Sequence, residues 1–338
     1  MKKDRRRVVV ITGASAGVGS ATAQAFAREG ARIALIARGR AGLNGARRDV
    51  ENLGGEALVL PLDVADADAV ENTAEKIEKK FGPIDVWVNN AMASVFSPIK
   101  EMTAEEFKRV TEVTYLGYVY GTLAALRRML PRNRGLIIQV GSALAYRGIP
   151  LQSAYCAAKH AIQGFVDSLR CELIHDKSRV RVTMIDMPAL NTPQFSWVKS
   201  RLPRKSQPVP PIYQPEIAAE AIVYASHYPR REIYVGMTTV GAIVVNKFVP
   251  GLLDQYLARF GYDSQQYDGR EDRHRPDNLW EPVDKEKDHG AHGQFDSRAA
   301  RHSPQLWTSM HRGWVAAGVL LIAGTLLTHF FRRESDGR

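Results

Sequence analysis

Thr12-Gly13-Ala14-Ser15-Ala16-Gly17-Val18-Gly19 stands directly after the apolar run at residues 8–11. Glycines let a strand turn abruptly into a helix and let a diphosphate approach the backbone, because no side chain blocks either. The helix expected over residues 17–29 offers unpaired N–H groups and the positive end of its dipole to that diphosphate. A glycine-rich turn alone is weak evidence, but a strand before it and a helix after it favour a dinucleotide-binding loop.

Short apolar runs alternate with helical stretches over residues 6–236. This alternation predicts an α/β fold with a Rossmann-like, doubly wound parallel sheet of about seven strands, covered by helices on both faces. Ligands of such folds bind at the carboxyl ends of the strands. The strands are expected at residues 8–11, 32–36, 57–60, 86–88, 136–140, 181–185 and 232–235.

A second pattern, Ser142 followed by Tyr155-x-x-x-Lys159, has the chemistry of proton transfer. Reduction of a carbonyl needs a group that gives a proton to the oxygen while a hydride reaches the carbon. A free phenol titrates at about 10, and a lysine one helical turn away is expected to favour the phenolate and so lower the pKa of Tyr155. Ser142, at the end of a strand, is expected to orient the substrate oxygen. The tyrosine–lysine spacing alone is weak evidence, but its order after the glycine loop and Ser142 strengthens it.

With these motifs in this order, residues 6–236 resemble the short-chain dehydrogenase/reductase superfamily. The resemblance implies that Ser142, Tyr155 and Lys159 are catalytic and that a nicotinamide dinucleotide is the cofactor. It also implies a set of cofactor-binding residues in the glycine loop, an adenine-contacting pair, a turn after the fourth strand, the catalytic helix and the loop after the sixth strand. These residues are Thr12, Gly13, Ser15, Gly17, Val18, Gly19, Asp63, Val64, Asn90, Tyr155, Lys159, Pro188 and Thr192.

Two positions depart from the family pattern. Thr114 stands where the family usually has an asparagine that supports a water-mediated proton relay, so the relay is either rebuilt or weakened here. Ala189 stands where the family has glycine after its sixth strand, while Pro188 and Thr192 stay in register. We expect a cofactor contact there, and the backbone geometry at Ala189 is an open question.

The form of the cofactor can be argued from charge at the end of the second strand. An acid at this place accepts hydrogen bonds from the ribose 2′-hydroxyl of NAD, whereas an arginine accommodates the 2′-phosphate of NADP. Here Ala37 is followed by Arg38, with Arg40 close behind and no carboxylate. The sequence therefore favours NADP(H) bound by Arg38, although a solvated charge at a helix start is the alternative.

The chain is expected to have four parts: a catalytic domain over residues 1–240, an amphipathic extension over 241–262, a polar linker over 263–313 and a transmembrane anchor over 314–331. Residues 190–213 carry aromatics and a run of prolines at 203, 208, 210 and 211, and we expect a mobile lid over the substrate there. A plain long connection is the alternative. The amphipathic extension is expected to lie on a membrane or line the substrate entrance, or else to pack on the core or on a second subunit.

Residues 314–331 contain no formal charge and are flanked by arginines and aromatics. This length is at the short end of what spans a bilayer, and the flanking residues suit an interface. A buried core helix is the alternative. We expect a membrane protein with a single-pass C-terminal anchor that contacts lipid, and a cytoplasmic catalytic domain because no secretory signal precedes the glycine loop. Arginine counts on the two sides do not settle the orientation.

The formal net charge of +10 suits an anionic membrane surface better than nucleic acid, because no nucleic-acid-binding module accompanies it. His289 and His292 lack cysteine or carboxylate partners at metal-site spacing, so we expect no metal site. The family resemblance implies a homo-oligomer. We therefore expect an NADP(H)-dependent oxidoreductase that interconverts a carbonyl and an alcohol on an apolar or lipid-like small molecule. The alternative is a weakly catalytic NADP(H)-binding membrane scaffold or redox sensor.

Overall fold

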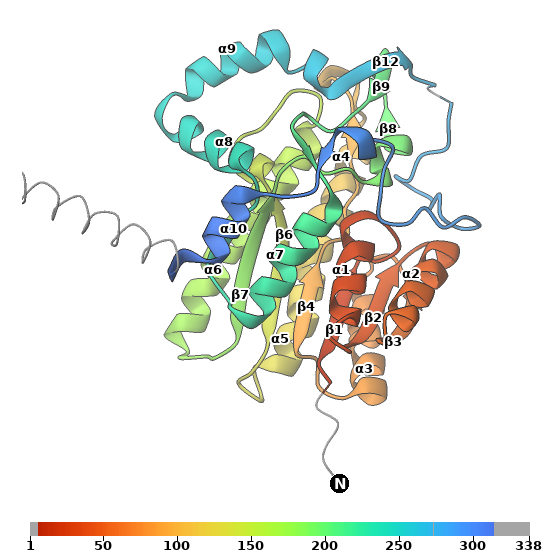
Figure 1. The fold of residues 1–338 in the computed structure, drawn as a ribbon, viewed down its shortest axis with the longest axis vertical. Coiled ribbons are helices and arrows are strands. Elements are labelled where there is room, and N and C mark those ends of the chain that lie inside the picture. The colour runs from red at the N-terminus through yellow and green to blue at the C-terminus, as the bar shows by residue number, and fades with distance from the viewer. Residues whose placement is uncertain (1–5, 273, 314–338) are drawn as a thin grey trace, which may run out of the picture.

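The computed structural model describes residues 6–272 and 274–313, and its centre is a seven-stranded sheet (Figure 1). The strands lie in the order β11-β7-β6-β4-β1-β2-β3, and all neighbours are parallel. This confirms the predicted doubly wound α/β fold. The strands are β1 Val8–Thr12, β2 Arg32–Ala37, β3 Glu56–Pro61, β4 Val86–Asn89, β6 Leu136–Ser142, β7 Arg181–Met187 and β11 Glu232–Tyr234.

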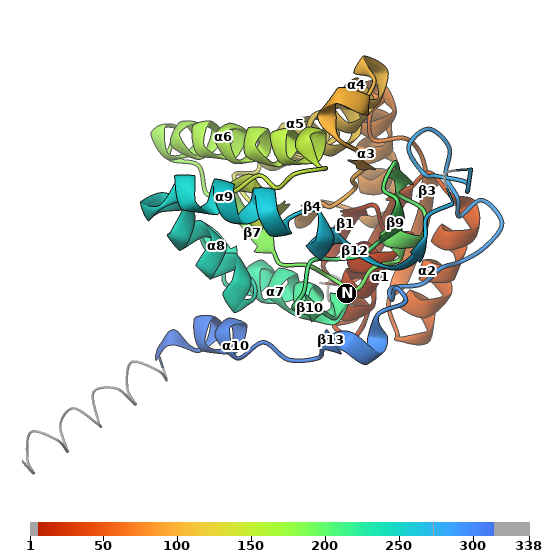
Figure 2. The same cartoon turned by 90° about the horizontal axis from the view of Figure 1, so that it is seen from above.

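Helices cover both faces of this sheet (Figure 2). Because both faces are covered, the central strands are apolar runs rather than alternating patterns, as β1 and β4 illustrate: each is apolar up to its last residue, and all their residues are buried. One face carries α1 Gly17–Ala27, α2 Arg40–Asn52 and α7 Pro215–His227. The other carries α3 Ala67–Phe81, α4 Ala104–Thr111, α5 Gly117–Met129 and α6 Ser153–His175, with the π-helix η2 Glu112–Leu116 joining α4 to α5.

The chain leaves β1 and β4 toward opposite faces, and this divergence opens a crevice at their carboxyl ends. The glycine loop lies at the end of β1. The serine of the predicted catalytic set lies at the end of β6, and α6 passes behind it. The topology therefore places the two motifs at the same edge of the sheet.

Above this edge, short ladders join distant parts of the chain. The predicted lid, residues 190–213, contains η4 Pro193–Ser196, β8 Lys199–Ser200, β9 Arg204–Ser206 and β10 Ile212–Tyr213. These strands pair with β5 Val95–Phe96, β12 Gln266–Arg270 and β13 Ala299–Ala300 respectively. The segment is thus hydrogen-bonded on several sides, which differs from the free lid that the prolines indicated. The remaining helices are η1 Ile99–Glu101, η3 Ala143–Ala145, α8 Met237–Phe248, α9 Pro250–Phe260, η5 Asp263–Gln265, η6 Asp296–Arg298 and α10 Pro304–Met310.

The expectation of a solvated linker over residues 263–313 is wrong for the residues that the structure describes. Leu279, Phe295 and Leu306 are fully or almost fully buried in three different apolar clusters of the catalytic domain. His292 hydrogen-bonds both Glu216 of α7 and Asp296, at 2.7 Å each. These single apolar anchors are spaced widely among charged residues, so they form no period that a sequence pattern would reveal.

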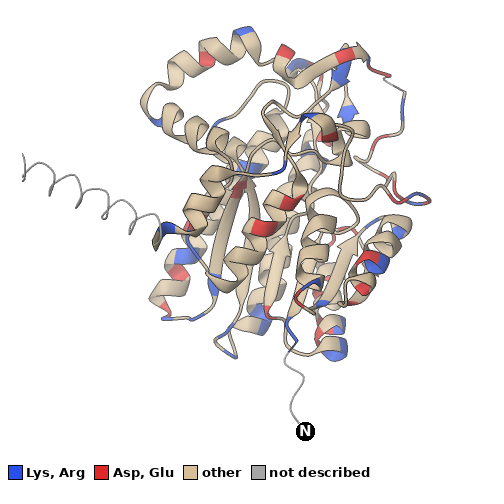
Figure 3. Cartoon of the chain, in the orientation of Figure 1, with Lys and Arg blue, Asp and Glu red and all other residues tan. Residues whose placement is uncertain are grey.

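Within residues 6–272 and 274–313, none of the helices combines the length and the apolar character needed to cross a bilayer. The predicted anchor over residues 314–331 lies outside the described residues. Charges of both signs lie on α2 and α3, whereas α1 carries no charged residue (Figure 3).

Candidate active site

The predicted site residues come together around one cavity of about 570 Å³ at the carboxyl edge of the sheet. It runs from the end of β2 to the helix α9. Thirteen of the fifteen predicted residues line it, and Thr12 and Gly19 do not. The lining residues are Gly13, Ser15, Gly17, Val18, Arg38, Asp63, Val64, Asn90, Ser142, Tyr155, Lys159, Pro188 and Thr192.

The glycine loop has the backbone that its sequence requires. Gly13 and Gly17 have φ angles of +67° and +57°, which side chains disfavour. A Cβ on Gly19 would collide with the carbonyl oxygen of Gly13, so this position packs the helix against the turn. Thr12 is buried beneath the loop, where its Oγ1 accepts hydrogen bonds from the backbone N–H groups of Asn90 (2.9 Å) and Ala91. Thr12 and Gly19 thus shape the loop instead of facing the cavity.

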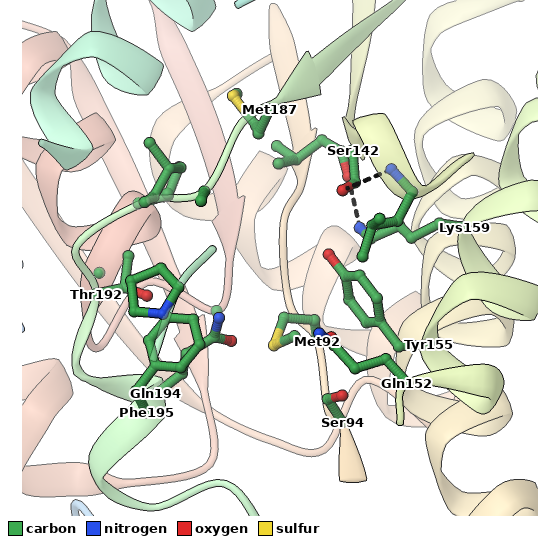
Figure 4. Close-up of a pocket in the computed structure, with 18 of the residues that line it drawn as sticks. Met92, Ser94, Ser142, Gln152, Tyr155, Lys159, Met187, Thr192, Gln194 and Phe195 are labelled. Atoms are coloured by element: carbon green, nitrogen blue, oxygen red, sulfur yellow. Dashed lines mark hydrogen bonds between the residues drawn. The ribbon is translucent and has the colours of Figure 1, made fainter. Parts of the chain in front are cut away.

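Tyr155 lies on the first turn of α6, and its hydroxyl is directed toward the end of β6 where Ser142 lies (Figure 4). Ser142 Oγ accepts a hydrogen bond from the N–H of Leu144 at 3.1 Å, which fixes the serine side chain. Burial raises the pKa of the Tyr155 phenol above its ordinary value, and a hydrogen bond with Ser142 acts in the opposite direction. The phenol therefore keeps its proton at neutral pH and is suited to donate it.

Lys159 is buried, and its ammonium donates to the carbonyl oxygen of Val140 (2.7 Å) and to the hydroxyl of Tyr118 (3.1 Å). Burial lowers its pKa to about 7, although nearby Asp186 acts to raise it. We expected this ammonium to lower the pKa of Tyr155, and the structure corrects that expectation. The lysine lies over the Tyr155 ring, 5.5 Å from its centroid, with its hydrogen bonds directed at Tyr118 and β6.

Tyr118 is a residue that the motif comparison missed. It is fully buried in α5, and its hydroxyl donates to Val140 O at 3.1 Å while accepting from Lys159. Thr114, by contrast, uses its hydroxyl on the backbone of Ala93, donating to the oxygen at 2.8 Å and accepting from the nitrogen at 3.0 Å. Tyr118 follows Thr114 by about one helical turn, where η2 continues into α5. The hydroxyl that accepts from Lys159 therefore comes from the turn after Thr114.

The second departure, Ala189, causes no backbone strain. Left-handed non-glycine residues within the described chain are Asn133, Leu151 and Lys177, and Ala189 is not among them. Its carbonyl accepts a hydrogen bond from the N–H of Tyr213 at 2.9 Å. The loop after β7 therefore tolerates alanine where the family has glycine.

At the far end of the cavity, Arg38 makes contacts that its sequence position did not indicate. Its guanidinium donates to the carbonyl oxygens of Trp280 (2.8 Å), Leu279 (3.4 Å) and Asn278. The neighbouring Asp63 pairs with Arg109 of α4. Burial acts to raise the pKa of Asp63, but the N–H of Ala65 and the Arg109 guanidinium outweigh it and hold that pKa below its ordinary range.

The opposite end of the cavity is mostly apolar. Phe96, Phe195 and Trp197 form one side, and Leu253 and Leu257 of α9 form another. Figure 4 shows Thr192, Gln194 and Phe195 facing Tyr155 and Gln152 across the open space. A carbonyl group placed beside Tyr155 would thus have an apolar chamber for the rest of its molecule.

This arrangement fits a nicotinamide dinucleotide. The glycine loop borders the place of a diphosphate, Asp63 and Val64 border the adenosine end, and Tyr155 with Lys159 borders the other. The N–H of Gly17, expected to be unpaired, instead donates to Gly290 O at 3.0 Å. The two ends belong to one continuous cavity. The fit of the dinucleotide depends on the continuity of the cavity between the two motifs and not on any single residue.

Comparisons with known proteins agree with the geometry. A family model described as short chain dehydrogenase matches residues 7–201. The chain is 35% identical over 269 residues to the uncharacterized oxidoreductase YxnA of Bacillus subtilis, covering 78% of this chain and 75% of that protein. It is 32% identical over 221 residues to a fatty acyl-CoA reductase of Acinetobacter baylyi, covering 65% of this chain and 72% of the relative.

Solved structures give the same result. A metagenomic short-chain oxidoreductase in complex with NADP superposes with a TM-score of 0.58 at 26% identity, covering 68% of this chain and 96% of that one. A short chain dehydrogenase from Bacillus anthracis superposes with a TM-score of 0.59 at 25% identity, covering 68% of this chain and 94% of its own.

Proposed function

Because the chain belongs to the short chain dehydrogenase family, we propose that it is an NADP(H)-dependent oxidoreductase that interconverts a carbonyl and an alcohol on an apolar substrate. The observation that carries this proposal is the meeting of Ser142, Tyr155 and Lys159 with the glycine loop around one cavity. When bound, the nicotinamide supplies or accepts the hydride. The protein must hold the substrate oxygen and move a proton to it.

Each residue of the set has a role that follows from its contacts. Tyr155 keeps its proton because burial raises its pKa, so it acts as the general acid toward a carbonyl oxygen. Ser142, fixed by the N–H of Leu144, holds the same oxygen in place. Lys159 and Tyr118 are hydrogen-bonded to each other beside the ring of Tyr155, and we propose that the ammonium would hold the ribose of a bound nicotinamide and return a proton to the site. Thr114 takes no part, because Ala93 occupies its hydroxyl.

The choice of NADP(H) rests on Arg38. This guanidinium lines the cavity at the end of β2, where a 2′-phosphate would lie in a dinucleotide fold. The carbonyls of residues 278–280 orient the guanidinium but carry no charge that would cancel its own. A solved relative of the same family is in complex with NADP, which supports the same choice.

Replacing Arg38 by Ala should weaken NADPH binding by on the order of 100-fold, since charge-assisted bonds to a phosphate are among the strongest polar contacts. NADH binding should change by about twofold or less, because NADH lacks the phosphate that Arg38 contacts. Fluorescence titration of both nucleotides measures the two dissociation constants. Arg40→Ala is the matched control, since Arg40 is an exposed arginine two residues away. An equal loss for NADPH and NADH in Arg38→Ala would count against this role.

The apolar nature of the substrate is supported by α8 and α9. Their outer face exposes Phe248, Leu252 and Phe260, with Phe248 79% exposed. The same pair of helices carries Leu253 and Leu257 into the cavity wall. Figure 3 shows few charges on these helices. An apolar compound would therefore meet apolar side chains both on the surface of these helices and in the cavity, and a relative named fatty acyl-CoA reductase fits such a substrate.

A series of linear aldehydes of increasing length tests this proposal with full-length protein and NADPH. Each added methylene that enters the apolar chamber contributes about 0.8 kcal/mol, so kcat/KM should rise about three- to fourfold per methylene until the chamber is filled. Small hydrophilic aldehydes serve as the comparison. A preference for the hydrophilic compounds, or tight NADPH binding without turnover of any carbonyl, would favour the alternative of an NADP(H)-binding scaffold.

The cellular setting completes the proposal. We propose that the apolar stretch 314–331 anchors the protein in a membrane, with the catalytic domain on the cytoplasmic side, and that the substrate reaches the site from lipid.

We also propose a homo-oligomer through α5 and α6. Leu123 of α5 and Ile174 of α6 are 44% and 67% exposed, and such apolar side chains suit a subunit interface.

A further inference from the structure

Residues 278–293, which we call the strap, run along the outside of the cofactor end of the cavity. In both cartoon views this part of the connection between β12 and β13 passes beside α1 and α2 (Figures 1 and 2). Its residues bond two parts of the cofactor site: Arg38, at the adenosine end, donates to the carbonyls of 278–280, and the N–H of Gly17, in the glycine loop, donates to Gly290 O at 3.0 Å. The strap is therefore part of the wall of the cofactor site.

Asp284 of the strap packs against the start of α2, at Gly39 and Gly42. A Cβ on Gly39 would collide with its carboxylate, and a Cβ on Gly42 would lie 2.5 Å from its Oδ2. The two glycines thus form a notch that admits the aspartate. The N–H of Gly42 donates to the backbone oxygen of Asp284 at 3.3 Å, which ties the strap to the first turn of α2. Asp284 as a whole is only 7% exposed, and it lines the same cavity as Arg38.

The two acids at this end of the cavity, Asp284 and Asp63, differ in their partners. Asp63, the other acid at this end, is committed to Arg109. Within the residues that the structure describes, no ion pair engages Asp284. The acid that is missing from the sequence after β2 is therefore supplied by a residue more than two hundred positions later. It stands beside Arg38, at the start of a helix whose own first turn contains no acid.

We propose that Asp284 is a specificity-determining residue that limits the preference of this site for NADP(H) over NAD(H). This inference rests on the proposed function, because it concerns the same cofactor. A carboxylate at the end of the second strand accepts hydrogen bonds from a ribose 2′-hydroxyl and repels a 2′-phosphate. Arg38 alone would favour the phosphate strongly, but Asp284 offsets its charge, so the discrimination between the two nucleotides is smaller than the sequence indicates.

Replacing Asp284 by Asn in the full-length chain tests this inference, because the amide keeps the shape and removes the charge. The dissociation constant for NADPH should fall about tenfold, equivalent to about 1.4 kcal/mol, since the like-charge repulsion is gone. The dissociation constant for NADH should stay the same or rise. Isothermal titration with each nucleotide gives the ratio directly. The fragments 2′-AMP and 5′-AMP repeat the comparison at the adenosine end alone, without the catalytic residues.

Glu286→Gln is the matched control, because it removes one negative charge from an exposed side chain of the same strap, whereas the charge of Glu281 itself acts on Arg38. Glu286→Gln should leave the NADPH to NADH ratio unchanged. Asp284→Ala should change the ratio in the same direction as Asp284→Asn, and thermal unfolding shows whether each variant is folded. A ratio that is unchanged in both folded variants, or changed equally by Glu286→Gln, would overturn the inference. If the wild-type protein binds neither nucleotide, the proposed function fails instead.

Discussion

Replacing Tyr155 by Phe is expected to lower kcat/KM for carbonyl reduction by about 10³-fold or more, at the upper part of the range for losing a general acid. The substitution removes one oxygen and keeps the ring that lies beside Lys159. Because burial already holds the phenol in its protonated form, the hydroxyl is the proton source for the substrate oxygen. NADPH affinity should change by about twofold or less, because the glycine loop and Arg38 remain in place.

Steady-state kinetics with NADPH and an apolar aldehyde, together with fluorescence titration of NADPH, separates the two effects. Tyr146→Phe is a matched control, because the Tyr146 hydroxyl bonds Glu232 at 3.1 Å and does not line the cavity. That variant should keep its activity within about threefold, as expected for a side chain outside the reacting groups. Unchanged turnover in Tyr155→Phe would remove the tyrosine from the mechanism.

Sequence reasoning was successful where the determining residues are close together along the chain. The glycine loop needs a strand, a turn and a helix within a few residues, and the structure has all three with Gly13 and Gly17 in left-handed conformations. The sheet was predictable because both of its faces are covered, so its strands are continuous apolar runs. The same reasoning brought Ser142 and Tyr155 to one edge of the sheet.

Sequence reasoning failed where the partner is distant. Arg38 bonds carbonyls that lie 240 to 242 positions away, and no local pattern encodes such a contact. The strap was assigned to a solvated linker because isolated apolar residues such as Leu279 have no periodicity among charged neighbours. As a result, the missing acid after β2 was counted as absent, whereas Asp284 supplies one from the strap.

The helical spacing of Tyr155 and Lys159 predicted that they lie close, and this is confirmed. It did not predict the direction of the ammonium. A side chain four residues along a helix can point to several partners, and here the carbonyl of Val140 and the hydroxyl of Tyr118 are within reach. The pKa that burial lowers here is that of the lysine itself, which falls to about 7.

Replacing Lys159 by Met should therefore have opposite effects on activity and on stability. The activity should fall by on the order of 10²- to 10³-fold, because the group that holds the ribose and returns the proton is gone. The free energy of unfolding at pH 7 should rise by on the order of 1–4 kcal/mol, because the buried ammonium carries a desolvation cost that the methionine does not. The methionine leaves Val140 O without its donor, which offsets part of this gain.

The pH dependence of the free energy of unfolding provides a second test of this stability prediction. The pKa of Lys159 is about 7 in the folded chain, below its ordinary value of 10.5, so the unfolded chain binds more protons between these two values. The wild-type free energy of unfolding should therefore rise with pH across this window, and Lys159→Met should lack that part of the rise. The advantage of the variant should be largest near pH 7 and disappear near pH 10.5. Urea unfolding at several pH values measures both curves.

Lys247→Met is the control for this experiment, because Lys247 is an exposed lysine on α8. It should change neither the activity nor the pH dependence of stability. A Lys159→Met protein that is less stable than the wild type at pH 7 would show that the ammonium stabilises the fold. Lys159 would then be a structural residue, and the predicted destabilisation of the fold by its burial would be wrong.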